Sequence, residues 1–174
     1  TLEGQNLKGD LRVRFDNFRF KKPLEKALEL IPESGGSSSQ LQVRLPSSSP
    51  AMSDWLSGFY TVSLLTKLPD LPAWTSNEMP LGLAPTISLS SLNASIGDTL
   101  TITCTPRLRS EQRVLILFAD RQLQPQPGDI NTPGDPTQPT ALTFQIPNVD
   151  TSVTNEFVVR LRVDGVDSVP FRPT

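Results

Sequence analysis

The stretch LTFQIP at residues 142–147 alternates apolar and polar side chains, which is the pattern of a β-strand with one buried face. A similar stretch, LQVRLP, occupies residues 41–46. Val43 and Phe144 take the same place in the two patterns, and they are 101 residues apart. We interpret the two stretches as one strand that occurs in two copies of a single domain.

Two further pairs of stretches support an internal repeat. Residues 60–64 (YTVSL) are similar to residues 157–161 (FVVRL) at an offset of 97, and Pro80 matches Pro170 at an offset of 90. An offset that shrinks only across loops is typical of two copies of one domain. A length of 174 residues also suits two domains of about 90 residues each. We therefore predict one domain at residues 1–84 and a second at residues 85–174.

The two copies differ at their beginnings. The second copy opens with residues 84–98, and the first copy has no counterpart of this stretch. We therefore predict that the first domain lacks its N-terminal strand and that the chain continues a longer polypeptide.

Short strands account for most of the sequence. Alternation recurs, for example, in LRVRF at residues 11–15, and the strands are bounded by Pro, Gly, Ser or Asp at the spacing of a β-sandwich. Asp164-Gly165 predicts a type I′ hairpin turn, because both residues tolerate a positive φ. The sequence thus predicts an all-β protein of two tandem immunoglobulin-like β-sandwiches. The strands predicted in the second domain are Thr86–Leu89, Thr99–Thr105, Arg113–Ala119, Thr140–Pro147, Glu156–Val163 and Val166–Phe171.

Two segments are predicted to depart from the strand pattern. Pro23–Ile31 carries apolar residues at helical spacing, with a proline at a plausible first position, and predicts one short helix. Gln124–Pro139 holds five of the 17 prolines and predicts an irregular loop.

The composition excludes several functional classes. The net charge of −2 disfavours nucleic-acid binding, which needs clustered basic residues, and no apolar run is long enough to predict a membrane span. Because the sequence has no histidine, it cannot form a Ser-His-Asp or Cys-His catalytic arrangement. Its one cysteine, Cys104, lies in a predicted strand and is interpreted as a small buried apolar residue. We predict no catalytic residue, no metal site and no cofactor.

A loop in the first domain is the strongest candidate for a protein interface. The connection after Leu64 is seven residues longer than its counterpart after Leu161, and it carries Leu68, Leu71 and Trp74 among prolines. Tryptophan is enriched at interface hot spots, so we predict a contact here. The alternative, in which Trp74 packs back onto the domain junction, stays open.

Two other groups of residues are weaker candidates for the same role. Trp55 is predicted either to anchor its loop on the sandwich or to join the interface. Five arginines on strands predict either a patch for an acidic partner or solvated outer faces. They are Arg12, Arg14, Arg44, Arg160 and Arg162.

The first domain resembles a known family of immunoglobulin-like domains, the IPT/TIG type. Residues 1–7 (TLEGQNL) followed by the strand at residues 11–15 resemble the opening of that family, in which a Gly-x-Asn-(Phe/Leu) stretch precedes a strand. Residues 58–62 (GFYTV) resemble its later Gly-x-Tyr-x-Val strand, and residues 77–81 resemble its closing strand.

A narrower resemblance concerns the junction at residues 76–87 and the runs at 113–117 and 159–168. These stretches look like the C-terminal immunoglobulin-like part of cap (tail-terminator) proteins from contractile, phage-tail-like injection systems. The resemblance implies a non-enzymatic structural protein in a ring of identical copies. We expect the ring to be hexameric, as the symmetry of such particles implies, with tube and sheath subunits as further partners. It implies assembly in the bacterial cytoplasm, without nucleic-acid binding or membrane insertion.

Two other functional classes remain open at this stage. A cell-surface adhesin or carbohydrate-binding module would agree with tandem immunoglobulin-like domains, and so would an accessory binding module of a larger enzyme. The full-length sequence would discriminate among the three hypotheses.

Overall fold

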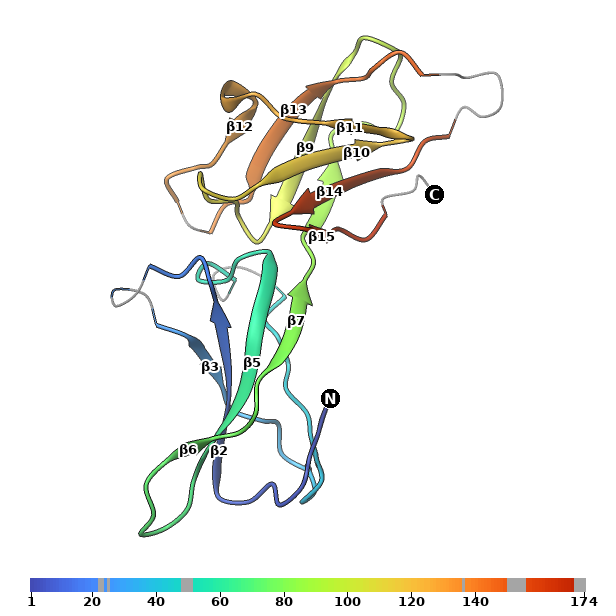
Figure 1. The fold of residues 1–174 in the computed structure, drawn as a ribbon. Helices are drawn as coiled ribbons and strands as arrows, with labels where there is room; N and C mark the ends of the chain where they lie inside the picture. Colours follow the sequence, from blue (N-terminus) through green and yellow to red (C-terminus); the bar gives the residue numbers. More distant parts are fainter. Residues whose placement is uncertain (22–23, 25, 48–51, 136, 150–155, 171–174) are drawn as a thin grey trace. The chain divides into compact units, whose positions relative to one another are not determined.

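The computed structural model describes residues 1–21, 24, 26–47, 52–135, 137–149 and 156–170 (Figure 1). Within these residues the regular structure is β-strand, apart from one 3-10 turn, η1 (Pro127–Asp129), so the all-β prediction is confirmed. The contacts divide the chain into two units. Unit 1 comprises Thr1–Pro46 and Phe59–Leu81, and unit 2 comprises Ser47–Gly58 and Gly82–Thr174.

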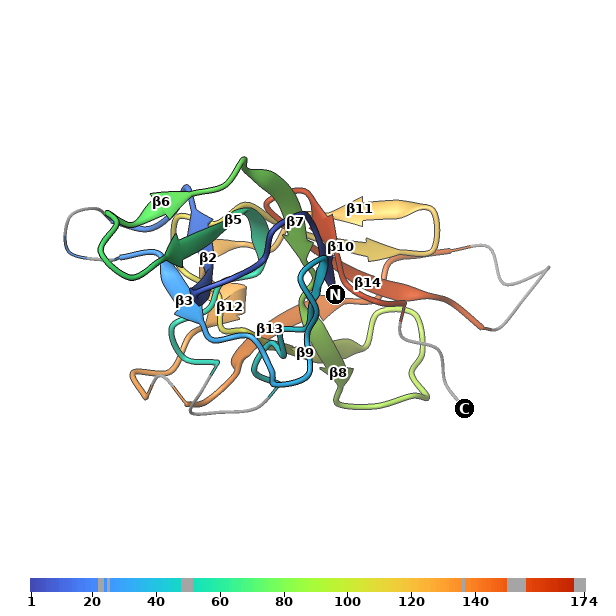
Figure 2. The same cartoon turned by 90° about the horizontal axis from the view of Figure 1, so that it is seen from below.

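Unit 1 contains one large sheet and one small one. The large sheet has the order β3-β2-β5-β6, with β7 also paired to β5, and the small sheet is the pair β1-β4. β2 and β5 form the long central ladder (Figures 1 and 2). In this ladder Val13 lies opposite Leu64 and Phe15 lies opposite Val62. The strands are β1 (Leu2–Glu3), β2 (Asp10–Asn17), β3 (Leu28–Leu30), β4 (Gln40–Leu41), β5 (Gly58–Lys67), β6 (Trp74–Thr75) and β7 (Met79–Leu83).

The core of unit 1 is small and aromatic. Alternate residues of β2 face inward, so Val13 and Phe15 are buried. The ring of Tyr60 meets the rings of Phe15 and Phe20 edge to face, at centroid distances of 6.5 and 6.1 Å. The buried apolar side chains described in this unit are Val13, Phe15, Phe20, Leu41, Tyr60 and Val62.

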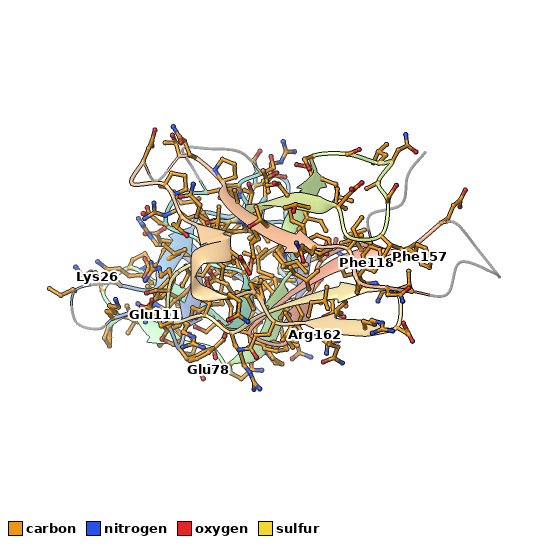
Figure 3. All side chains as sticks on the ribbon, turned by 90° about the horizontal axis from the view of Figure 1, so that it is seen from above. Lys26, Glu78, Glu111, Phe118, Phe157 and Arg162 are labelled. Atoms are coloured by element: carbon orange, nitrogen blue, oxygen red, sulfur yellow. The ribbon has the colours of Figure 1, made fainter. Side chains whose placement is uncertain are left out.

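Unit 2 contains two four-stranded sheets of orders β11-β10-β14-β15 and β12-β13-β9-β8. Its core is larger and comprises 15 buried side chains among the described residues. Phe118 packs there beside Phe144 and beside Phe157, and the latter pair is labelled in Figure 3. The strands are β8 (Thr86–Leu89), β9 (Thr99–Thr105), β10 (Val114–Phe118), β11 (Arg121–Leu123), β12 (Ile130–Asn131), β13 (Thr140–Gln145), β14 (Val159–Val163) and β15 (Val166–Asp167).

The predicted strands of unit 2 agree well with those observed. β8 and β9 have the predicted bounds, whereas β10, β13, β14 and β15 are shorter than predicted. Asp164 and Gly165 have φ values of 47° and 89°, as the predicted hairpin turn requires. The predicted loop at Gln124–Pro139 contains η1 and the short strand β12.

Two secondary-structure predictions in unit 1 were wrong. Residues 28–30, predicted as part of a helix, form β3 and pair with the edge of β2, while Leu24 and Ile31 are 90% and 71% exposed. The pairing with the edge of β2 stabilises these residues more than their weak helical preference does. Of the alternating residues 41–46, predicted as a strand, only Leu41 belongs to one, β4 (Gln40–Leu41). Pro23 and part of the predicted helix lie outside the described residues.

The large sheet of unit 1 and one sheet of unit 2 share their strand order and register. Val13 of β2 lies opposite Leu64 of β5, and Ile116 of β10 lies opposite Leu161 of β14. β3 and β11 take the outer position beside β2 and β10 in the same way. Leu64 and Leu161 are 97 residues apart, which is the offset seen in the sequence.

A serine makes the same hydrogen bonds at the far edge of both sheets. Ser76 donates its N–H to Leu64 O (2.8 Å), and its Oγ accepts the N–H of Leu64 (2.9 Å) and donates to Asn77 O (2.8 Å). Ser168 does the same with Leu161 O (2.7 Å), Leu161 N–H (3.0 Å) and the next carbonyl (3.1 Å). In each unit the serine hydroxyl therefore accepts the leucine N–H in place of a backbone carbonyl.

The small sheet of unit 1 corresponds to the middle of the second sheet of unit 2. Leu2 of β1 lies opposite Leu41 of β4, as Ile102 of β9 lies opposite Leu142 of β13. Unit 2 extends this pair with β8 on one side and β12 on the other. Among the described residues of unit 1, no strand corresponds to either of them.

Candidate functional site

The predicted interface loop connects β5 to β6, and it is the green loop beyond those strands in Figure 1. Trp74 and Leu71 are 59% and 54% exposed, whereas Leu68 is half-buried. Leu71 donates its N–H to Leu68 O (3.3 Å), and Asp70 adopts a φ of 60°. The loop is thus a tight turn that holds two apolar side chains toward solvent.

Gly9 allows the chain to pass close to this loop. A Cβ at Gly9 would lie 2.6 Å from Lys67 O and 2.9 Å from the Cδ2 atom of Leu68, and the residue has a φ of 94°. Only glycine fits both the space and the backbone conformation without strain. The base of the loop is therefore fixed by the turn that precedes β2.

An apolar groove of about 330 Å³ opens beside the loop. Its lining residues come from β2, β4 and β5, from the N-terminal segment that contains β1, and from the edge that contains β6 and β7. Trp74 and Met79, which is 58% exposed, belong to that edge. We refer to the apolar lining residues of β2, β4 and β5 as the floor, and they are Leu11, Leu41, Val62 and Leu64.

Trp55 is not among the residues that line the groove. It belongs to the segment that groups with unit 2 and is only 3% exposed, and its N–H donates to Met52 O (3.1 Å). Of the four residues predicted for an interface, Leu68 and Leu71 thus lie in the loop after β5, and Trp74 follows them as the first residue of β6. Trp55 has the burial of a loop anchor. It presents almost no surface to a partner.

Gln112 holds that segment, and nothing in the sequence pattern pointed to it. Its Nε2 donates to Ser57 O (2.8 Å) and to the Oδ2 atom of Asp164 (3.2 Å), and its Oε1 accepts the N–H of Arg109 (3.0 Å). The side chain is 7% exposed. Buried amides normally make such a full set of bonds, so the role of Gln112 is structural.

Most of the five arginines predicted on strands are paired with carboxylates, and Arg44 lies in coil after β4 rather than in a strand. Arg14 pairs with Glu29 (3.0 Å) and Arg44 pairs with Glu33 (3.0 Å). Arg162 donates from both Nε and a terminal nitrogen to the carboxylate of Asp167, and this hydrogen bonding lowers the pKa of Asp167. Three of the five arginines are therefore neutralised by carboxylates of their own unit.

The environment of Cys104 does not favour nucleophilic reactivity or metal binding. It is fully buried, its Sγ donates to Pro106 O (3.4 Å), and burial raises the pKa of its thiol to about 12. A thiol with such a pKa is a poor nucleophile and a poor metal ligand. The described residues contain no group of three or more side chains suited to hold a metal ion, and they contain no helix long and apolar enough to cross a membrane.

The fold and the groove define the chain as an all-β protein with an exposed apolar site. A family model described as a domain of unknown function, DUF8756, matches residues 83–174. These residues are more than half of the chain and nearly all of unit 2, so the chain belongs to this family. No curated protein matches the chain.

Proposed function

We propose that this chain is a non-enzymatic structural component of the cap of a contractile, phage-tail-like injection system. The observation that carries the proposal is the apolar loop of Leu71 and Trp74 beside an open groove. Exposed apolar clusters of this kind on soluble proteins are typical of protein contacts. The resemblance of residues 76–87, 113–117 and 159–168 to cap proteins supplies the particular assembly.

The proposal includes two tandem immunoglobulin-like sandwiches of the IPT/TIG type. The shared strand register and the equivalent bonds of Ser76 and Ser168 support a duplicated domain. Other copies of the chain in a ring, and tube or sheath subunits, would be the partners, and the bacterial cytoplasm would be the place of assembly.

Incorporation of a loop variant into particles tests the proposal. In the full-length protein, Trp74→Ala should reduce the fraction that co-sediments with assembled particles, because the variant removes the largest exposed apolar group of the loop. Thermal unfolding of the purified chain should change by no more than about 1 kcal/mol. A matched control is Phe18→Ala, which removes an aromatic ring that is 68% exposed in the same unit but lies outside the loop.

Two results would contradict this proposal. Equal incorporation of the Trp74 variant and the unsubstituted protein would show that the loop makes no contact in the particle. A large loss of stability would show instead that Trp74 belongs to the core.

A carbohydrate-binding role is the second candidate, and it is favoured by Trp74 standing beside polar groove residues such as Gln5 and Asn77. Aromatic faces and amides are suited to sugar rings. Saturable binding of a glycan, lost in Trp74→Ala and kept in Phe18→Ala, would favour this function over the cap.

A further inference from the structure

Three arginines of unit 2 line a second hollow, which has a volume of about 260 Å³. On β14 the core side chains alternate with Arg160, which is exposed, and Arg162, which is half-buried. Because side chains alternate along a strand, both arginines project from the outer face of the sheet. Arg121, the first residue of β11, is the third. We call this site the arginine hollow.

The strand register arranges the side chains of the arginine hollow. Leu117 of β10 lies opposite Arg160 on β14 and opposite Gln122 on β11, and all three line the hollow. Arg162 follows Arg160 on the same face of β14, and alternate positions of a strand are about 6.6 Å apart. The hollow therefore presents two arginines at the spacing of alternate residues in an extended chain, with an apolar side chain beside them.

Asp167 holds Arg162 in place without using all of its donors. Arg162 donates from Nε to Oδ1 of Asp167 and from one terminal nitrogen, Nη2, to Oδ2 (3.0 Å). Among the described residues, the other terminal nitrogen, Nη1, has no hydrogen-bond partner. A guanidinium is planar and has N–H donors on each of its nitrogens. The ion pair thus orients a group that can still bind a second carboxylate.

Arg121 and Arg160 are not neutralised in this way. Both are exposed, and within the described part of the chain neither guanidinium forms a hydrogen bond or an ion pair. The pKa of Asp167 is lowered chiefly by the hydrogen bonds from Arg162, and the positive charge of Arg160 lowers it further. Asp120 is the one carboxylate among the residues that line the hollow. Positive charge therefore exceeds negative charge there by a small margin.

We propose that the arginine hollow binds an acidic segment of another protein, in which two glutamates occupy alternate positions of an extended chain. Their carboxylates would meet Arg160 and the Nη1 atom of Arg162, and the methylene groups of one glutamate would lie on Leu117. The planar donors of arginine match the two oxygens of a carboxylate. The inference goes beyond the proposed function, because it does not require that the partner belong to a contractile particle.

Charge complementarity favours this occupant over nucleic acid. Nucleic-acid binding needs many positive charges against a dense line of phosphates. The hollow has only three arginines, one of them already paired, and it also contains Asp120. This small excess of positive charge suits one or two carboxylates. Electrostatic complementarity contributes more to the choice of a partner than to affinity, so we expect weak binding to a short peptide.

Titration of the 15N-labelled chain with short peptides tests the proposal. The probe is a pentapeptide of sequence TETET with blocked ends, and its control, TQTQT, has glutamine in place of both glutamates. We expect saturable binding of the first peptide alone, with amide shifts at β10, β11 and β14 and a shift of the Nε–H of Arg160. Equal shifts with both peptides, or no saturation by about 10 mM, would overturn the proposal.

Two arginine variants with the same change in charge provide a matched comparison. Arg160→Gln should weaken the binding of TETET at least about fivefold. Arg113→Gln changes an exposed arginine of the same unit that does not line the hollow, and it should change the affinity less than about twofold. Equal weakening in the two variants would reduce the effect to net charge and would overturn the site.

Asp120 provides a test of the opposite sign. Asp120→Asn removes the one carboxylate that lines the hollow, so it should tighten the binding of TETET about two- to threefold. Weaker binding in this variant would contradict charge complementarity.

A nucleic-acid probe tests the identity of the occupant. A short oligothymidine should bind more weakly than TETET at physiological ionic strength. Tighter binding of the oligonucleotide, lost in Arg160→Gln, would replace the acidic peptide with nucleic acid and overturn the proposal. These titrations need only the isolated chain, so their outcome is separate from that of the Trp74→Ala experiment on particles.

Discussion

The two units share one sheet and differ in the other. Among the described residues, unit 2 has two four-stranded sheets and a core of 15 buried side chains, whereas unit 1 has a five-stranded sheet, the pair β1-β4 and six buried apolar side chains. β8 pairs with β9 in unit 2, and among the described residues of unit 1 no strand has this place beside β1. Within the described residues, unit 2 thus encloses the larger apolar core.

This difference has an energetic consequence. Burial of apolar surface contributes about 25 cal/mol per Å², so a side chain that is enclosed in unit 2 contributes more than its half-covered counterpart in unit 1. Equivalent positions of the two units therefore make natural pairs for mutation.

The largest expected effect concerns the central strands. Leu161 is fully buried, whereas its counterpart Leu64 is half-buried at the floor of the groove. Leu161→Ala should lower the free energy of unfolding by about 2–5 kcal/mol, and Leu64→Ala should lower it by about 1 kcal/mol. Urea denaturation followed through resonances of each unit measures both changes. Equal losses would show that unit 1 is as well packed as unit 2.

The serine pair gives the next effect. Ser168 is 3% exposed and Ser76 is exposed. Ser168→Ala leaves the N–H of Leu161 without a partner in a dry environment, and it should cost about 1–3 kcal/mol. At Ser76→Ala, water can replace the hydroxyl, so we expect less than about 1 kcal/mol from the same denaturation experiment. A larger loss at Ser76 would reverse the comparison.

The thiol of Cys104 makes the stability of unit 2 depend on pH. Burial raises its pKa from 9.0 to about 12, so the folded state retains a proton that the unfolded state releases above pH 9. Its contribution is therefore complete below pH 9 and is lost as the pH rises toward 12, by about 1.4 kcal/mol per pH unit. The difference between the unsubstituted protein and Cys104→Ala should shrink over this range. A constant difference would contradict the assigned burial.

The surface ion pairs should have the smallest effects in both units. Arg14 pairs with Glu29 in unit 1, and Arg162 pairs with Asp167 in unit 2, all at exposed or half-exposed positions. Such pairs contribute little and are screened by salt. Arg14→Gln and Arg162→Gln should each shift the urea midpoint less than Leu64→Ala does. A salt-independent shift of that size or more would assign a structural role to the pair.

The contribution of Asp167 to the stability of unit 2 also depends on pH. Its pKa lies below the ordinary value because Arg162 donates hydrogen bonds to it, so its contribution is present at neutral pH and is lost on acidification through that lowered pKa.

Local patterns in the sequence predicted much of unit 2 and less of unit 1. Strong alternation and the Asp164-Gly165 turn determined β8, β9 and the last hairpin, because each of these elements is specified by adjacent residues. β3 was mistaken for helix, because the open edge of β2 decides its conformation and that edge is remote in the sequence. Unit 2 is the part that the family model covers.

The candidate site was predicted in part for the same reason. Prolines around Trp74 identified the loop, but the groove needs β1, β5 and β7 together, and no local pattern brings these strands together. The bonds of Gln112 to Ser57 and Asp164 join segments more than 50 residues apart and left no sequence signal.

Amide hydrogen exchange at two equivalent residues tests the central claim most directly. Thr101 bonds to Ser90, so the alternation along β9 turns the N–H of Thr103 toward β8. Gly4 donates its N–H to Ser39 O, so the N–H of Glu3 points away from β4. Our account predicts strong protection at Thr103 and nearly none at Glu3. Protection at Glu3 in the isolated chain equal to that at Thr103 would show that the edge of β1 is already occupied, and it would contradict the account.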